Sequence, residues 1–419
     1  MRTTTVTASN NKEVIMAEQR RRYTVVFRDR MVPHAAARAI LSRSKQNPLA
    51  LRTFDLHRDI AEVVGDVHFS EIGVSYLDLS DEEVRALTAD RNISSLHPIH
   101  EIRNGGWPIT AQAEPFAAAL PLPAEGQADA GLPWNVAMVR ADQVWSDTKG
   151  RGVKVAVLDN GINRHRPDLV VAGGVSFVPD IVDWDDDDGH GTHCAGIIAA
   201  NAPEQGVIGV APECALYAVK VMTKGSGNTD WLVAGMMWAA QNKMDVASMS
   251  LWQTAGAASP DEAPWEDVQR AAQFLTDAGC LVVGIAGNSG SMINHWVTNP
   301  GRCPAVMAVG AVDDQGLWWD KSSYGPPELP IAQSVEVAAP GAAIKSTFLG
   351  NEFQLYWGTS MACPHVAGAA ALCKSIDPTL SAATIRERLR CTAQDRGAAG
   401  LDEKYGLGIL DCVAAAIRK

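Results

Sequence analysis

The sequence has no apolar run long enough to cross a membrane. The longest apolar stretch follows Ser360, but His365 and Lys374 interrupt it and it is too short for a bilayer. The first residues are polar and contain no secretory signal, since their longest apolar run spans only residues 14–17. We therefore expect no membrane partner and a cytoplasmic location. Secretion is the alternative if the start is misassigned or export is non-standard.

Cysteine is absent from the first 190 residues, and no two cysteines show the CxxC spacing. The missing spacing gives zinc sites and dithiol redox sites little support. All eight cysteines follow residue 190, and their pairing cannot be deduced from the sequence. In a cytoplasmic protein of this size, the default is free, buried thiols.

Basic residues are also few, since 36 lysines and arginines stand against 48 aspartates and glutamates. The formal net charge is −12, and most of the excess acid lies in the C-terminal two-thirds of the chain. A negative surface repels nucleic acid, so we expect no nucleic-acid partner. The chain shows no internal repeat, and 419 residues suffice for one large domain and a smaller one.

Composition and periodicity divide the chain into four segments. Residues 1–21 are polar and predicted to be disordered. Residues 22–104 show strand and helix signals in the order β-α-β-β-α-β, with one poorly marked strand in the middle. This order is typical of a small ferredoxin-like α+β domain. Residues 105–132 are rich in glycine, proline and alanine and predict a linker, which is followed by residues 133–419.

Local signals place the elements of the small domain. Strands are predicted at 23–27, within 67–79 and at 93–102, with a helix at 34–44. Ser80 and Glu83 have the spacing of a capping box and predict the start of a second, short helix.

The segment 133–419 alternates between strand and helix signals. Near-continuous apolar runs of strand length are typical of strands buried on both faces, and they occur at 153–158, 215–221, 245–251, 281–285 and 306–312. Helical stretches lie between them, as at 193–200 and 231–242. This alternation predicts a doubly wound, mostly parallel α/β domain.

Four polar residues stand where such a sheet presents its active site, at the carboxyl ends of strands and at helix starts. Asp159 follows the run 153–158, and Asn288 follows the strand 281–285 after a glycine. His190 lies between two glycines, and Ser360 precedes a long stretch of small apolar residues. Each residue taken alone also fits a structural role. A zinc site at His190 has little support, because no HExxH motif is present.

Together the four residues predict nucleophilic catalysis. A serine hydroxyl is a weak nucleophile until a base takes its proton. His190 would take the proton of Ser360 and pass it to the leaving amine, while Asp159 orients the imidazole. Asn288 would donate its amide N–H to the oxyanion, together with the backbone N–H of Ser360.

The order Asp, His, Ser, each within its own motif, resembles the subtilisin-like serine proteases, or subtilases. Residues 155–162, 190–196 and 358–365 match the three motifs, with Asn160 and Cys363 where serine or threonine is usual. The resemblance covers about 133–419. It implies a peptidase domain that hydrolyses proteins or peptides through an acyl-enzyme and needs no cofactor for the chemistry.

Residues 22–104 resemble the inhibitor-type propeptide of the same family, which assists folding, covers the active site and is removed by the enzyme itself. The resemblance implies a self-processing zymogen that is cut between Arg103 and Pro133. We expect the enzyme to be a monomer. The rival interpretation is a catalytically silent subtilase that serves as a binding scaffold, and the complete set of four residues argues against it.

The resemblance also implies where the substrate lies. It would run as an extended strand along two segments, with a pocket floor near a third, and the residues concerned are Ser250, Leu251, Trp252, Ile285, Ala286, Gly287 and Thr298. Trp252 would either wall a pocket for an apolar residue or pack on its own loop. The acidic run at 183–188 is either a solvated loop or a preference for a basic residue just before the cleaved residue, with Asp188 as its partner.

A structural calcium ion is a further implication of the resemblance. Asp168 matches a calcium-binding aspartate of the family, and residues 201–207 match the loop that completes the site. Pro203 stands there in place of an amide-bearing ligand, so the loop supplies fewer oxygens than calcium requires. Cys194 and Cys363, one turn after His190 and Ser360, are either buried packing residues or thiols whose modification stops the enzyme.

Overall fold

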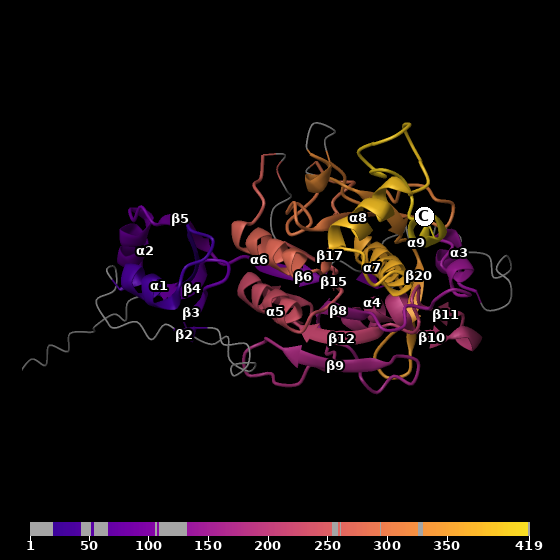
Figure 1. Ribbon diagram of the computed structural model, residues 1–419, viewed down its shortest axis with the longest axis horizontal. Helices are drawn as coiled ribbons and strands as arrows, with labels where there is room; N and C mark the ends of the chain where they lie inside the picture. Colours follow the sequence, from indigo (N-terminus) through magenta and orange to yellow (C-terminus); the bar gives the residue numbers. More distant parts are fainter. Residues whose placement is uncertain are drawn as a thin grey trace, which may run out of the picture.

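The computed structural model describes residues 20–42, 52–53, 66–104, 107–108, 132–253, 259, 261–293, 295–325 and 330–417. These residues form a small N-terminal unit and a larger C-terminal unit (Figure 1). Most of the predicted disordered segment and most of the predicted linker fall outside the described residues. Among the helices of the described residues, none is both long enough and apolar enough to span a bilayer.

The small unit is one sheet with two helices. Its strands have the order β2-β3-β4-β1-β5, in which β4 and β5 both pair antiparallel with β1. The strands are β1 (Arg21–Phe27), β2 (Arg52–Thr53), β3 (Val67–Phe69), β4 (Val74–Leu79) and β5 (Ile93–Pro98); the helices are α1 (His34–Leu41) and α2 (Asp81–Thr88). The order β3-β4-β1-β5 is that of a ferredoxin-like domain. The capping box of Ser80 and Glu83 is present at the start of α2.

Two predicted strands are wrong in extent. The segment 67–79 contains two strands, β3 and β4, joined by a turn in which Gly73 has φ +60°. The segment 93–102 is also divided, because β5 ends at Pro98, which has no N–H to continue the ladder. The chain then leaves this sheet, and β6 (Glu101–Asn104) pairs with strands of the large unit.

The large unit is built on seven strands, and every neighbouring pair is parallel. In spatial order they are β19 (Val337–Pro340), β18 (Met307–Val312), β17 (Leu281–Ile285), β15 (Val246–Met249), β8 (Lys154–Asp159), β12 (Ala215–Lys220) and β9 (Val171–Ser176). One apolar core holds α4 (His190–Ala199) and α7 (Thr359–Ile376), and the other holds α5 (Thr229–Gln241) and α6 (Glu266–Asp277). Helices on both faces confirm the predicted doubly wound α/β fold.

Shorter elements complete the large unit. The remaining helices are α3 (Trp134–Met138), α8 (Ala382–Cys391) and α9 (Cys412–Ile417). Three small sheets contain β10 (Asn201–Ala202) with β11 (Val207–Ile208); β13 (Met222–Thr223), β14 (Ser226–Asn228), β6 and β16 (Leu251–Gln253); and β20 (Ile344–Thr347), β21 (Phe353–Trp357) and β7 (Trp107–Pro108).

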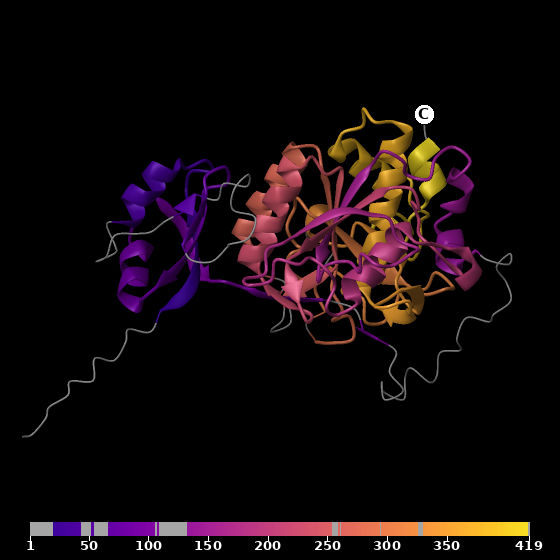
Figure 2. The ribbon, with the colours of Figure 1, turned by 90° about the horizontal axis from the view of Figure 1, so that it is seen from below.

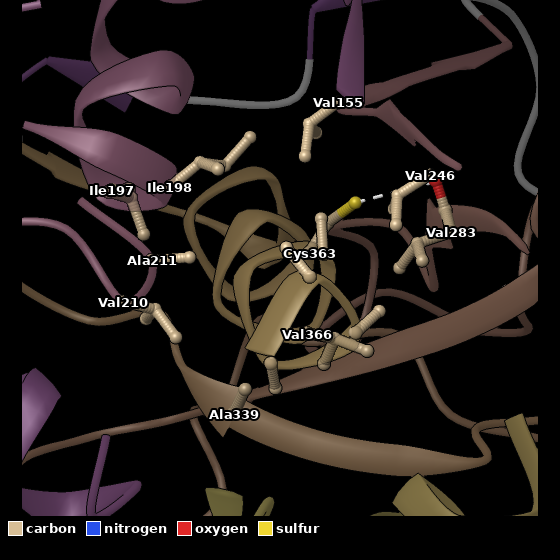
Figure 3. Packing of buried hydrophobic residues seen from close by; sticks show 14 of the residues in the cluster. Val155, Ile197, Ile198, Val210, Ala211, Val246, Val283, Ala339, Cys363 and Val366 are labelled. Carbon is tan, nitrogen blue, oxygen red and sulfur yellow. Dashed lines mark hydrogen bonds between the residues drawn. The ribbon is translucent and has the colours of Figure 1, made fainter. Parts of the chain in front are cut away.

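Helix α7 runs through the larger apolar core. All its residues from Thr359 to Cys373 are buried, and most are small, which lets neighbouring elements approach closely. Figure 3 shows Cys363 of α7 between Ile197 and Ile198 of α4 and Val246 and Val283 of the sheet. The first turns of α7 are therefore packed on both sides.

The small unit docks on α5 and α6 (Figure 2). Val26 and Tyr76 of its sheet join the apolar core of those helices, while α1 and α2 pack on the opposite face. The Tyr76 hydroxyl donates to Asp267 Oδ2 over 2.9 Å, and both residues are buried. One face of this sheet thus packs on α5 and α6 of the large unit, and the other packs on α1 and α2.

Candidate active site

Asp159 and His190 are hydrogen-bonded to each other and wholly buried. Asp159 ends β8 and His190 begins α4, with its Nδ1 3.0 and 2.9 Å from the two Asp159 carboxylate oxygens. The preceding Gly189 has φ +98°, and a Cβ there would collide with the Phe348 ring. Burial by itself would lower the pKa of His190, but the Asp159 carboxylate outweighs it and raises this pKa well above 6.5.

Ser360 is the second residue of α7. Its hydroxyl donates to the Ser250 carbonyl oxygen over 3.2 Å. Its own carbonyl accepts from Ser250 Oγ at 2.9 Å and from Cys194 Sγ at 3.5 Å, because Pro364 has no N–H to bond it within the helix. His190 Nε2 is buried and has no hydrogen-bond partner in the described part of the chain. His190 and Ser360 are thus linked through Cys194, which lies 3.9 Å from His190 Nδ1, and not by a hydrogen bond of their own.

Asn288 lies beside the start of α7. Its amide oxygen accepts from the Thr359 backbone N–H over 2.9 Å and from the Thr359 hydroxyl over 2.8 Å. Two donors on the oxygen fix the amide, so its NH₂ group points the other way. The structure therefore brings the asparagine next to the serine, at the N-terminus of α7, where partial positive charge favours an anion.

One of the two predicted substrate segments, 250–253, borders β6 through strand β16. Leu251 and Trp252 belong to β16 and lie opposite Asn104 and Arg103 of β6. Trp252 is half-buried and packs against the core that contains α7. Strand β14 borders the other edge of β6. Sequence reasoning missed β14, because its three residues, Ser226–Asn228, carry no apolar strand pattern.

The remaining predicted residues lie beside β16. The backbone N–H and the hydroxyl of Thr298 both donate to the Ala286 carbonyl, over 3.0 and 3.5 Å. The Gly287 backbone N–H donates to the Thr359 hydroxyl over 3.3 Å, which ties Ile285, Ala286 and Gly287 to the start of α7. The Asn299 carbonyl accepts from the Gln253 N–H over 3.0 Å, so this region connects to the end of β16.

The region of the predicted calcium ligand does not fit a cation. Both carboxylate oxygens of Asp168 are paired with the Arg166 guanidinium, at 2.7 and 2.6 Å, and both side chains are almost wholly buried. The same guanidinium donates to the Glu352 carbonyl over 2.8 Å and lies 4.6 Å from the Phe353 ring centroid. A fixed positive charge therefore occupies the side of Asp168 that a calcium ion would need.

All eight cysteines, which lie within the described residues, are free; seven are buried and Cys391 is exposed. Burial raises the pKa of Cys194, and it raises that of Cys363 to about 12, which disfavours the reactive thiolate at both positions. Asp159, His190 and Cys194 have ligand atoms within 4.8 Å of one another, the one such group in the described ranges. The Asp159–His190 hydrogen bonds already use the facing atoms of this group.

Residues 150–408 match the model of the subtilase family, which is more than half of the chain. A thermostable alkaline protease of Halalkalibacterium halodurans is 38% identical over 344 residues, which cover 82% of each chain. The M-protease of Shouchella clausii is 38% identical over 349 residues, 83% of this chain and 80% of that protein. Subtilisin Savinase of Lederbergia lenta is 42% identical over 286 residues, 68% of this chain and 98% of that protein.

The expected cytoplasmic location is wrong. It was based on the polar start of the sequence, whereas the similarity to alkaline proteases and subtilisins points to secretion. From the family match and the similarity over most of its length, the chain belongs to the subtilase family and is a serine endopeptidase.

Proposed function

We propose that this protease cuts peptide bonds through an acyl-enzyme on Ser360, with His190 as base, Asp159 as the group that orients it and Asn288 as oxyanion donor. The observation that carries the proposal is the buried pair of His190 Nδ1 and Asp159, 2.9 Å apart beside the start of α7. Nδ1 is occupied by the carboxylate, so Nε2 is left to take a proton.

In the first half of the reaction, Ser360 Oγ forms a bond to the substrate carbonyl carbon and its proton passes to His190 Nε2. The carbonyl oxygen becomes an oxyanion, which accepts hydrogen bonds from the Asn288 NH₂ group and the Ser360 backbone N–H. The C–N bond then breaks, and His190 gives its proton to the leaving amine. Water repeats these steps on the acyl-enzyme and restores Ser360.

The described contacts support two features of this mechanism. Leaving His190 Nε2 buried without a partner costs about 1–3 kcal/mol, and a serine or substrate proton satisfies it. The weak 3.2 Å bond from Ser360 to Ser250 must be exchanged for one to His190. A small hydroxyl can make this exchange by rotating about its Cα–Cβ bond.

We further propose that residues 22–104 are a propeptide and intramolecular inhibitor, that 105–132 form the linker and that 133–419 form the peptidase domain. Strand β6 supports this proposal, because it is hydrogen-bonded on one edge to β14 and on the other to β16. Two residues after β6, β7 pairs with Trp357 and Tyr356, just ahead of Ser360. Because the described ends of β6 and β7 both pair with segments that border Ser360, we expect self-cleavage between Asn104 and Trp107.

A fluorophosphonate probe and a processing assay test both parts. The probe should label Ser360 of the wild-type chain, as read by peptide mass spectrometry. Purified Ser360→Ala should stay full-length and unlabelled, while Ser375→Ala, the same substitution near the other end of α7, should be processed normally. Processing of Ser360→Ala in isolation would contradict self-cleavage, and failure of the probe to reach Ser360 would favour the silent scaffold.

All four reacting residues come from one chain, so we propose that the enzyme works as a monomer. Analytical ultracentrifugation of the processed enzyme should give the mass of a single chain at the concentration used for activity assays.

A further inference from the structure

Asn160 directly follows Asp159 in the chain and is wholly buried. Its backbone N–H and its side-chain Nδ2 both donate to Asp159 Oδ1, over 2.8 and 3.2 Å. The same carboxylate oxygen lies 3.0 Å from His190 Nδ1. Two of the donors that fix the Asp159 carboxylate therefore come from Asn160.

The other end of the Asn160 amide faces the edge that borders β6. Asn160 Oδ1 accepts from the backbone N–H of Gly225 over 3.0 Å. Gly225 directly precedes β14, and its carbonyl accepts from the backbone N–H of Asn104 over 3.2 Å. A carboxylate only accepts and a backbone N–H only donates, so these two partners decide which end of the amide carries the oxygen. One planar group thus joins Asp159 to the edge on which β6 lies.

The backbone on both sides of this amide is held by Lys220 and Asp187. The buried Lys220 ammonium donates to the Asn160 carbonyl over 2.5 Å and pairs with Asp187 at 3.0 Å. Asp187 also accepts from the Lys224 backbone N–H over 3.1 Å and from the Thr223 hydroxyl. Asn160 and the turn between β13 and β14 are thus held by one buried cation, which couples the position of the turn to that of the amide.

Strand β6 shows how a substrate strand would meet this link. Along β6 and β16, Asn104 lies opposite Leu251. A substrate strand in the same place brings its next residue opposite Ser250, whose carbonyl oxygen is 3.2 Å from Ser360 Oγ. The residue at the place of Asn104 is thus the one before the residue whose carbonyl is attacked, and its N–H donates to the Gly225 carbonyl.

We propose that Asn160 is a positioning residue that lets a bound substrate strand hold the Asp159 carboxylate toward His190. The proposal rests on the proposed function, because it takes Asp159 and His190 as groups that act on Ser360. The bonds form one chain, from the substrate N–H to the Gly225 carbonyl, from the Gly225 N–H to the Asn160 amide and from that amide to Asp159. Bonds in such a chain strengthen one another, so binding at the edge raises the rate of the reaction as well as the affinity.

The length of the asparagine side chain makes this link possible. Serine, which is usual at this place in the family, puts its oxygen where Asn160 has Cγ. That oxygen still reaches the adjacent Asp159, but it is one bond short of the Gly225 N–H. Asn160→Ser therefore keeps the contact with the carboxylate and removes the link to the substrate strand.

Two peptide p-nitroanilides test the proposal. They differ only in the residue before the one whose carbonyl is attacked, which is alanine in one and lactic acid, with an ester oxygen in place of the N–H, in the other. Processed wild-type enzyme should show a kcat about fivefold higher for the alanine peptide, the coupling expected between groups of one hydrogen-bond network. In Asn160→Ser the two kcat values should be equal, while the alanine peptide keeps the lower KM. Asn160→Thr should behave in the same way.

Asn163→Ser is the matched control. The amide of Asn163 donates to the Gly350 carbonyl over 3.1 Å and accepts from the His165 backbone N–H over 3.1 Å. It also joins two backbone groups, but neither is part of the chain of bonds to Asp159. This variant should keep the wild-type kcat ratio, and melting temperatures measured on all variants check that each is folded.

Fluorophosphonate labelling of Ser360 separates this proposal from the proposed function. Equal wild-type kcat values for the two peptides, or a kcat ratio in Asn160→Ser that stays at the wild-type value, with Ser360 labelled throughout, overturns the role of Asn160 and leaves the mechanism standing. A wild-type enzyme that hydrolyses neither peptide and is not labelled overturns the mechanism, and the role of Asn160 with it.

Discussion

The two units differ in where the partners of certain buried polar groups lie. Tyr76 and Arg22 of the small unit bond Asp267 and Asp230 of the large unit, the second pair at 3.3 Å, although His68 and Ser75 bond each other within the small unit. At the active site of the large unit, the buried partners Asp159 and His190 both belong to that unit. A contact between units can be undone by separation without unfolding the large unit, whereas an internal pair is part of the fold. The difference is consistent with the proposed removal of the small unit as a propeptide.

Breaking the internal pair at the active site should have the largest effect. In Asp159→Asn the amide presents a donor toward His190 Nδ1, which favours the wrong tautomer, so we expect kcat to fall by about 10⁴-fold. The processed fold should persist, because the buried side chain keeps its size. Steady-state kinetics and the melting temperature, measured on the same sample, check this. A loss of less than tenfold would contradict the role given to Asp159.

Breaking the buried Arg166–Asp168 pair should lower stability and not activity. Arg166→Leu leaves the Asp168 carboxylate buried and unpaired, which costs about 3–5 kcal/mol of unfolding free energy. The solvent-exposed pair of Arg151 and Glu213 is the control, and Arg151→Leu should cost about 1 kcal/mol or less. Urea unfolding measures both.

The response of the melting temperature to calcium also tests the pairing of Asp168 with Arg166. Because the guanidinium occupies the cation side of Asp168, added calcium should change the melting temperatures of the wild type and of Asp168→Asn by the same amount. Calcium-dependent stabilisation that disappears in Asp168→Asn would show that the aspartate does bind the ion.

Weakening the contact between the units should have a smaller effect. Tyr76→Phe removes the hydroxyl that bonds Asp267 and leaves a buried carboxylate short of one donor, at about 1–3 kcal/mol. In the uncut Ser360→Ala chain, hydrogen exchange should accelerate in the small unit and remain unchanged in the seven-stranded sheet. Tyr217→Phe, within the large unit, should change neither. Equal acceleration in both units would mean that they unfold as one.

The pH dependence of activity should show the smallest effect. Asp159 raises the pKa of His190 above 6.5, so its neutral, proton-accepting form appears only as the pH rises through that higher value. We therefore expect kcat/KM to increase with pH and to have its inflection above 6.5. In Asp159→Asn burial then dominates, and the inflection of the residual activity should move below 6.5. The stabilising Asp159–His190 charge pair follows the opposite course, being present at low pH and lost as the pH rises through the same pKa.

The strands of the large unit were the most predictable part of the fold. The run 281–285 coincides with β17, and 153–158 differs from β8 by one residue at each end. These strands are buried on both faces, so their continuous apolar pattern is strong. The run 245–251 was read as one strand but contains β15 and the start of β16, since a change of sheet leaves no mark in hydrophobicity.

Periodicity and short motifs are local, so they were enough to predict the alternation of strands and helices and to identify the four residues proposed for the reaction. Tertiary structure alone decided that β6 leaves its own sheet and that Arg166 takes the Asp168 carboxylate. It also decided that Asp188, of the acidic run at 183–188, meets Asn104. Strand β6 lies more than 80 residues from β14 and β16 in the chain, and Asn104 likewise lies more than 80 residues from Asp188. Strand register and packing bring these partners together. The Arg166–Asp168 pair is close in sequence but is oriented by the distant carbonyl of Glu352.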